Sequence, residues 1–232
     1  MKSMTPVRTA ALAAAPTPAA KAALAWAHGA RFLTTASLLA QLPASELPEI
    51  AFVGRSNAGK STAINTLAQQ RRLAFASRTP GRTQHINLFE VGPKDAPDAL
   101  LCDLPGYGYA AVERAAKLRW QAVMADYLQL RRPLHGVVLM IDSRLGFTDL
   151  DLRLLGLIAP RLANGEVRLL ALLTKADKLN RREAEAALAK SQDALAEVST
   201  ESADIGVMLF SALSRQGLED FAETLHGWRQ QP

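Results

Sequence analysis

The most informative residues of this chain are eight consecutive ones that match the pattern G-x-x-x-x-G-K-[ST], namely Gly54-Arg55-Ser56-Asn57-Ala58-Gly59-Lys60-Ser61. Gly54 and Gly59 let successive backbone N–H groups turn inward around an anion. Lys60 can place its ammonium on terminal phosphates, and the Ser61 hydroxyl can bind Mg²⁺, which prefers oxygen ligands. An apolar run at 50–53 precedes the pattern, and a segment with helical spacing, which includes Thr62, follows at 61–67. The sequence therefore predicts a loop that binds nucleotide phosphates and Mg²⁺.

A second candidate segment, Asp103-Leu104-Pro105-Gly106, directly follows an apolar run at 99–102. A carboxylate in this position can reach Mg²⁺ through a water molecule, and the Gly106 amide can donate to a terminal phosphate. Gly106 and Gly108 give the segment the hinge freedom that a switch needs. The pattern D-x-x-G is a weak signal alone, but it is a strong one 43 residues after Lys60.

Two later segments are candidates for reading a base. Thr174-Lys175-Ala176-Asp177 follows an apolar strand, and Phe210-Ser211-Ala212 closes the last one. Guanine presents N1–H and N2–H₂ side by side, which match two carboxylate oxygens, whereas adenine would leave the carboxylate of Asp177 facing an unprotonated nitrogen. The Ala212 amide could bond guanine O6. Taken alone, Asp177 is better explained as the cap of a strand-to-helix turn.

A third magnesium ligand is expected between the phosphate loop and the next strand. The segment 79–85 contains Gly81, Arg82, Gln84 and His85, and two threonines compete for the role. A threonine hydroxyl there can bind Mg²⁺ while its amide holds the γ-phosphate, so that loss of the phosphate releases the segment. Thr83 is favoured over Thr79 because it lies nearer the strand that begins at residue 86.

The elements that must position these residues alternate along the chain. Strands are expected at 50–53, 86–91, 99–102, 137–141, 168–173 and 206–210, and helices at 61–67, 113–131, 149–163, 182–198 and 217–229. This order predicts an α/β three-layer sandwich with a mostly parallel, six-stranded sheet and one antiparallel edge strand from a hairpin. Ligands of such sheets bind at the carboxyl ends of the strands, where each motif falls.

Composition bounds the remaining organisation. The net charge is +5 with a pI near 9.6, and there is one cysteine, which excludes an internal disulfide and suits a reducing, cytoplasmic compartment. No apolar run approaches the ~20 residues of a membrane span. Residues 1–28 are rich in Ala and Pro and contain no acid. We interpret them as a disordered leader, in preference to a transit or signal peptide, with a nucleotide-binding domain at 29–232.

Together the motifs resemble the Ras-like P-loop GTPases, and more closely the EngB (YihA/YsxC) family of the TrmE–Era–EngA–YihA–septin class. The stretch Asp103-Leu104-Pro105-Gly106-Tyr107-Gly108-Tyr109-Ala110 is the most specific part, and the resemblance covers about residues 31–230. It implies binding of GTP and GDP, Mg²⁺, slow hydrolysis by a monomer, and a role in assembly of the large ribosomal subunit on which septation depends. It assigns catalysis to Lys60, Thr83 and Gly106. It assigns metal binding to Ser61, Thr83 and Asp103. The other nucleotide contacts it implies lie in 54–62, 81–85, 103–106, 174–177 and 210–212.

Two positions depart from the common GTPase pattern, and a third, Asn57, is shared with a subset of related GTPases. Many GTPases have a glutamine after the D-x-x-G glycine to orient the attacking water, but here the residue is Tyr107, so we expect a slow intrinsic rate. In related GTPases an asparagine at the position of Asn57 accompanies K⁺, and here it either helps to hold K⁺ or only stabilises the loop backbone. Thr174 replaces a common asparagine and can still tie the loops together through its hydroxyl.

The partner and the reaction class each keep an alternative. From Ala51 to Phe89 there is no acidic residue, and several arginines are present. These arginines could face the RNA of a large-subunit precursor, or they could form a solvated basic loop. A P-loop kinase or ATPase would lack the base-reading Asp177. A non-hydrolysing, GTP-dependent adaptor at the division septum is the alternative function.

Overall fold

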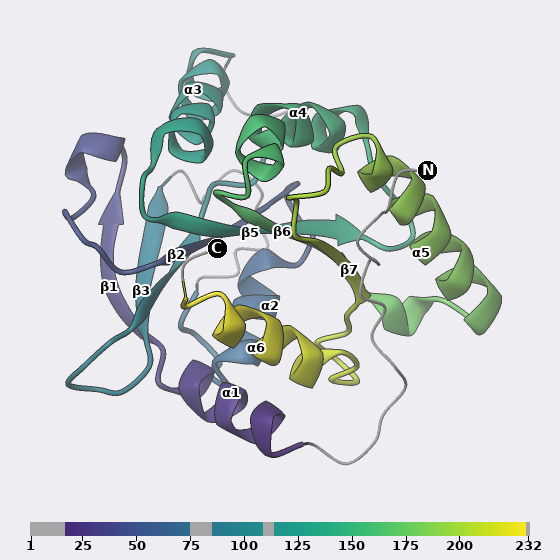
Figure 1. Cartoon of the computed structure of the whole chain (residues 1–232), viewed down its shortest axis with the longest axis horizontal. Helices are drawn as coiled ribbons and strands as arrows, with labels where there is room; N and C mark the ends of the chain where they lie inside the picture. Colours follow the sequence, from purple (N-terminus) through teal and green to yellow (C-terminus); the bar gives the residue numbers. More distant parts are fainter. Residues whose placement is uncertain (1–16, 75–84, 109–113, 231–232) are drawn as a thin grey trace.

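The computed structural model describes residues 17–74, 85–108 and 114–230. It has three layers, in which one central sheet lies between two layers of helices (Figure 1). The strands are β1 (Arg31–Ala36), β2 (Glu49–Gly54), β3 (Ile86–Val91), β4 (Ala99–Asp103), β5 (Leu134–Asp142), β6 (Arg168–Thr174) and β7 (Ile205–Leu209). The helices are α1 (Pro18–His28), α2 (Lys60–Leu67), α3 (Arg114–Leu130), α4 (Asp149–Ala163), α5 (Arg181–Ala196) and α6 (Leu218–Gly227), with short 3₁₀ turns η1 (Leu39–Gln41) and η2 (Ala176–Lys178).

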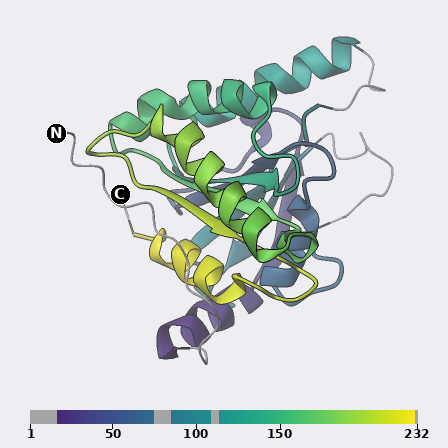
Figure 2. The same ribbon diagram turned by 90° about the vertical axis from the view of Figure 1, so that its right-hand side faces the viewer.

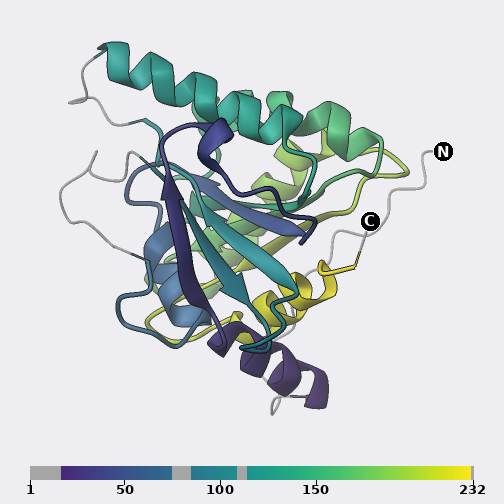
Figure 3. The ribbon, with the colours of Figure 1, turned by 90° about the vertical axis from the view of Figure 1, so that its left-hand side faces the viewer.

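The sheet confirms the α/β class but corrects its strand count. Its order is β1-β3-β4-β2-β5-β6-β7, so the described residues contribute seven strands where six were expected. β3 is antiparallel to both of its neighbours, and the other described pairings are parallel. The expected antiparallel strand therefore lies inside the sheet, because β1 covers its outer side (Figure 3). β1 escaped the sequence pattern because only Ala36 of its six residues is buried, which leaves no apolar alternation to read.

The first helix corrects the expected domain boundary. Thr17 caps α1 through its hydroxyl, which accepts from the Ala20 amide at 3.0 Å, and proline occupies the first turn, where its missing N–H costs nothing. Four of its residues are buried, and α1 packs along α6. The Trp26 indole also donates to Asp98 Oδ1 at 2.7 Å. The expectation of disorder up to residue 28 is thus wrong for 18–28, whereas residues 1–16 lie outside the described part.

Alternation along the strands divides the core between the two faces of the sheet. In β5, Val137, Leu139 and Ile141 pack toward α3, α4 and α5, whereas Val138 and Met140 pack toward α1, α2 and α6. Figure 2 shows the two helical layers on opposite sides of the strands. The parallel strands β2, β4, β5, β6 and β7 have their carboxyl ends at the same edge, which therefore gathers the residues that follow each of them. No helix in the described ranges is long and apolar enough to cross a membrane.

Candidate functional site

The phosphate-loop sequence runs from the fully buried strand β2 into the first turn of α2. At Gly54 a Cβ atom would lie 2.7 Å from the Met140 carbonyl oxygen, so no larger residue fits between β2 and β5. Gly59, with φ +97°, is the N-cap of α2, a backbone conformation that favours glycine. The loop therefore presents the N-terminus of α2 with Lys60 and Ser61 in its first turn, which is the local geometry that an anion requires.

Thr174 and Lys175 attach the end of β6 to this loop. The Thr174 hydroxyl lies 2.7 Å from the Ala58 carbonyl oxygen and 3.1 Å from that of Ile141, so it joins the loop to β5 and β6. Lys175 donates from Nζ to the Asn57 carbonyl at 2.9 Å. The structure thus places Thr174 in the tying position that the sequence suggested for it.

The two segments proposed to read a base lie side by side. Ser211 donates from Oγ to Asp177 Oδ1 at 2.7 Å, and the Ala176 amide donates to the Phe210 carbonyl at 3.1 Å. The hydrogen bond from Ser211, reinforced by Lys178, holds the pKa of Asp177 below its ordinary value, so its carboxylate is charged at neutral pH. Asp177 does not cap the following helix, because Asn180 is the N-cap of α5.

Asp103 ends β4 and is buried, with 1% of its surface exposed. Its Oδ1 atom has no hydrogen-bond partner within the described residues. Burial raises the pKa of Asp103, and the Lys60 ammonium and a hydrogen bond from Ser61 oppose that rise. A buried carboxylate with an unpartnered oxygen beside the Ser61 hydroxyl fits a hard cation such as Mg²⁺, which takes oxygen ligands.

The D-x-x-G segment lies against the phosphate loop. The Ser56 amide donates to the Tyr107 carbonyl at 2.9 Å, and the Tyr107 amide donates to the Gly54 carbonyl at 3.3 Å. A Cβ on Gly106 would lie 3.2 Å from Ser56, so only a residue without a side chain sits comfortably there. Any group bound in the loop therefore adjoins the backbone of Gly106.

The side chain of Tyr107 points elsewhere. Its hydroxyl donates to Asp151 Oδ1 at 2.6 Å, and both residues are buried. Burial raises the pKa of Tyr107 far above its ordinary value, so the hydroxyl stays protonated. The side chain at the usual glutamine position is therefore hydrogen-bonded to Asp151 of α4, and it does not present a group that could orient a water molecule.

The remaining expected contacts are only partly described. Thr83, its competitor Thr79, and Gly81, Arg82 and Gln84 lie outside the described residues. His85 is described, and its ring Nδ1 lies 2.8 Å from the Ser37 hydroxyl oxygen while the ring meets Trp120 edge-on. Neither partner belongs to the expected nucleotide-contacting set.

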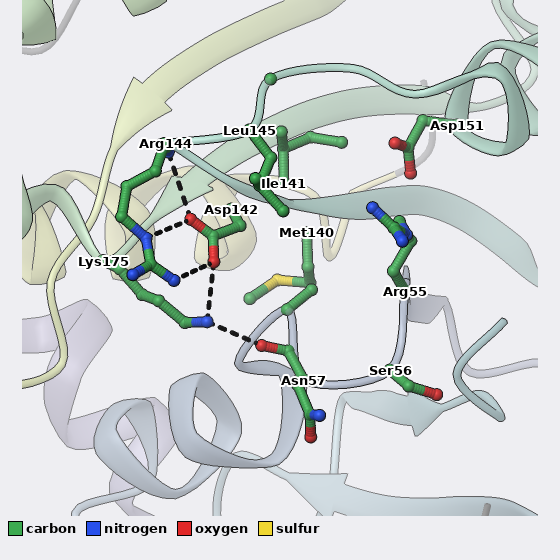
Figure 4. Close-up of a pocket in the computed structure, with 12 residues that line it drawn as sticks. Arg55, Ser56, Asn57, Met140, Ile141, Asp142, Arg144, Leu145, Asp151 and Lys175 are labelled. Carbon is green, nitrogen blue, oxygen red and sulfur yellow. Dashed lines mark hydrogen bonds and ion pairs between the residues drawn. The ribbon is translucent and has the colours of Figure 1, made fainter. Parts of the chain in front are cut away.

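Sequence reasoning did not predict a pocket between the phosphate loop and the carboxyl end of β5. It has a volume of about 230 Å³ and is lined by loop residues 55–58, by the end of β5 and by the turn that leads to α4 (Figure 4). Within this pocket the carboxylate of Asp142 accepts hydrogen bonds from the side chains of Arg144 and Lys175. Asp142 could have been found by the rule that located Asp103, because it too is a carboxylate at the carboxyl end of an apolar strand.

Comparison with known proteins agrees with this geometry. A family model described as a 50S ribosome-binding GTPase matches residues 49–175. A GTP-binding protein EngB of Polaromonas sp. is 55% identical over all of this chain and 91% of its own length, and one of Acidovorax ebreus is 56% identical over 88% of this chain and 90% of its own length. The crystal structure of a further EngB protein shares the fold, with a TM-score of 0.57 at 20% identity over 78% of this chain and 98% of that chain. This chain belongs to the EngB family of P-loop GTPases.

Proposed function

We propose that this protein is a monomeric, cytoplasmic GTPase that assists assembly of the large ribosomal subunit, and that cell division depends on it through that role. Two facts support a ribosomal partner. The matching family model is described as ribosome-binding, and the chain has no acidic residue between Ala51 and Phe89. The observation that best supports the proposal is the exposed pair Arg71 and Arg72, which lies four residues beyond the last residue of α2 in this acid-free stretch. Exposed cations in a stretch without acidic residues suit RNA phosphates.

Mg²⁺ is the proposed metal, held by the hydroxyl of Ser61 and the carboxylate of Asp103, with Thr83 as a third ligand. When bound, it neutralises charge that develops on the transferring phosphoryl group. The chain itself supplies the Lys60 ammonium and the α2 N-terminus for the phosphates. Asp177 supplies a charged carboxylate for guanine N1–H and N2–H₂, and the Ser211 hydrogen bond fixes its orientation.

The proposed switch is the segment that ends in Gly106 and Tyr107. Its backbone bonds to Gly54 and Ser56 place the Gly106 amide beside the phosphate loop, where a γ-phosphate would add a contact that GDP lacks. Hydrolysis by the isolated protein is proposed to be slow, because the Tyr107 hydroxyl is bonded to Asp151 and orients no water. A ribosomal partner or K⁺ near Asn57 would supply the missing assistance.

Binding to purified large-subunit precursors tests the partner. We expect co-sedimentation with a non-hydrolysable GTP analogue, weaker binding with GDP, and a steep loss of binding as salt rises. Replacing Arg71 and Arg72 together by alanine should weaken binding. The same change at Arg181 and Arg182, a second pair of consecutive exposed arginines at the start of α5, should not. Equal binding in GTP analogue and GDP would contradict the switch.

Phosphate release in the same mixtures separates the two functions. An assembly GTPase releases phosphate faster when precursors are added, whereas a non-hydrolysing septal adaptor binds GTP without releasing phosphate. Depletion of the protein in cells shows whether the ribosomal or the septation defect appears first. We expect large-subunit precursors to accumulate before septation fails, and septation failure with normal ribosome profiles would favour the adaptor.

A further inference from the structure

Asp142, at the carboxyl end of β5, lies outside the nucleotide-binding motifs, and its carboxylate is at the centre of a charged group with Arg144 and Lys175. Its Oδ2 accepts from Lys175 Nζ at 2.8 Å and from Arg144 Nη2 at 2.7 Å, and its Oδ1 accepts from Arg144 Nε at 2.9 Å. The Arg144 backbone amide adds a bond at 3.1 Å. Only 9% of the Asp142 side chain is exposed, so the carboxylate is nearly enclosed by these donors (Figure 4).

Lys175 connects Asp142 to the phosphate loop, because its ammonium donates both to Asp142 and to the Asn57 carbonyl. Its backbone has φ +59°, a left-handed conformation that long side chains rarely adopt, and its ammonium donates to the carbonyl of Asn57, which has φ +67°. Conformations of this kind persist only where surrounding contacts hold them. The stem of Lys175 thus spans from the base-reading segment 174–177 to the phosphate loop, and Asp142 supplies the charge that holds its far end.

We propose that Asp142 is a positioning residue for guanine-nucleotide binding: it holds the Lys175 ammonium on the Asn57 carbonyl, so that the base-reading segment and the phosphate loop keep one relative placement. Arg144 orients the Asp142 carboxylate by donating to it from the backbone amide, Nε and Nη2. The half-exposed side chain of Arg144 makes no other hydrogen bond in the described ranges. The inference rests on the nucleotide binding of the family and is independent of the ribosomal role.

The change Asp142→Asn tests the inference directly. It leaves two cations, Arg144 and Lys175, around a neutral amide, so the ammonium loses the charge that retains it beside the loop. We expect GDP to dissociate faster by on the order of tenfold, measured by displacement of a fluorescent GDP from the full-length protein. Asp149→Asn is the matched control, because it removes the same charge from an exposed position seven residues away and should leave the dissociation rate unchanged.

A double-mutant cycle separates positioning from a merely structural role. In a Lys175→Met background, which keeps the stem and removes the ammonium, Asp142→Asn should change GDP dissociation less than about twofold, because its partner is already absent. Equal acceleration in both backgrounds, or no acceleration in the wild-type background, overturns the proposal. If Asp142→Asn does not fold, Lys175→Met alone decides: it must accelerate GDP dissociation by a similar factor, and an unchanged rate overturns the proposal.

Discussion

The hydroxyl of Tyr107 donates to the carboxylate of Asp151 at 2.6 Å, and this bond ties the D-x-x-G segment to the first turn of α4. The other oxygen of Asp151 accepts from the amide and the hydroxyl of Thr148, so the carboxylate is also part of the helix cap. Because the backbone of Tyr107 is bonded to Gly54 and Ser56, the same residue connects α4 to the phosphate loop. Its side chain acts as an anchor in a position where other GTPases use a glutamine.

Tyr107→Phe should lower both stability and hydrolysis. It leaves Asp151 Oδ1 buried without a donor, which costs about 1–3 kcal/mol in the free energy of unfolding. Loosening the Gly106 amide should slow single-turnover GTP hydrolysis about tenfold, less than the ~100-fold that a 1 Å misplacement can cost. Denaturant unfolding and single-turnover phosphate release measure the two effects.

Tyr127→Phe is the matched control for that change. Tyr127 also donates from its hydroxyl to a buried carboxylate at 2.6 Å, that of Glu49, but its bond joins α3 to the amino end of β2. Both variants should lose stability, Tyr127→Phe the less because Glu49 Oε2 still accepts from Arg131 Nε at 3.0 Å, and only Tyr107→Phe should slow hydrolysis. A similar fall in hydrolysis for both variants would show that the effect comes from general destabilisation and not from the anchor.

The base preference should follow Asp177. Asp177→Asn replaces one acceptor oxygen by a donor, so guanine loses a paired contact while xanthine, which presents a carbonyl at the 2-position, gains one. We expect GTP affinity to fall by at least about 100-fold and xanthosine triphosphate to bind in its place. Competition for a fluorescent guanine nucleotide measures both. The exposed Asp193→Asn serves as the control, and unchanged GTP affinity in Asp177→Asn would refute the assignment.

The parts of the fold that the sequence predicted share one property, which is a continuous apolar run or a strong helical period. β5 and β6 are almost wholly buried and were readable for that reason. β1 and α1 were not, because β1 is exposed over most of its length and α1 buries small residues such as Ala23 and Ala27, which composition cannot distinguish from an alanine-rich leader. Their burial depends on α6 and β3, which are distant in sequence.

The candidate site was predictable to the extent that its residues end neighbouring strands. Thr174 and Asp103 follow apolar runs, and parallel packing then brings their loops together. The anchor between Tyr107 and Asp151 was not predictable, because it joins residues 44 positions apart and leaves no periodic pattern. Only the three-dimensional path of the segment after β4 reveals that Tyr107 turns away from the phosphate loop.

The helix α1 should stabilise the protein without contributing to nucleotide binding. Trp26 is buried against α6 and donates to Asp98. Asp98 directly precedes the amino end of β4, whereas Asp103 is at the carboxyl end of the same strand. Trp26→Ala should reduce the free energy of unfolding by about 3–5 kcal/mol. GDP dissociation measured well below the melting temperature should stay at the wild-type rate, and faster dissociation would show that α1 also supports the site.

The ion pairs of Asp142 should make stability depend on acidity in a defined direction. Hydrogen bonds from Arg144, and then from Lys175, hold the pKa of Asp142 far below its ordinary value of 3.8. A carboxyl with a depressed folded-state pKa stabilises the protein fully above the unfolded-state pKa, and it loses that contribution as pH falls through the folded-state value. The stability difference between wild type and Asp142→Asn should therefore be constant from pH 7 to about 5 and shrink below about pH 4. Parallel urea titrations measure it, and a difference that grows on acidification would contradict the ion-pair assignment.

Asn57 offers the sharpest test of how hydrolysis is assisted. Its side chain is exposed and makes no hydrogen bond within the described residues, while its backbone, at φ +67°, is in the left-handed region that asparagine and glycine tolerate best. Asn57→Ala confounds the two roles, because it removes the amide and strains the backbone by about 1–2 kcal/mol. Asn57→Gly removes the side chain, amide included, and keeps the left-handed backbone conformation accessible. If the amide helps to hold K⁺, the wild-type protein should hydrolyse GTP faster in K⁺ than in Na⁺, and both variants should lose that difference. If Asn57 serves only the backbone, Asn57→Gly should keep the wild-type response to K⁺ and only Asn57→Ala should be impaired, equally in both salts.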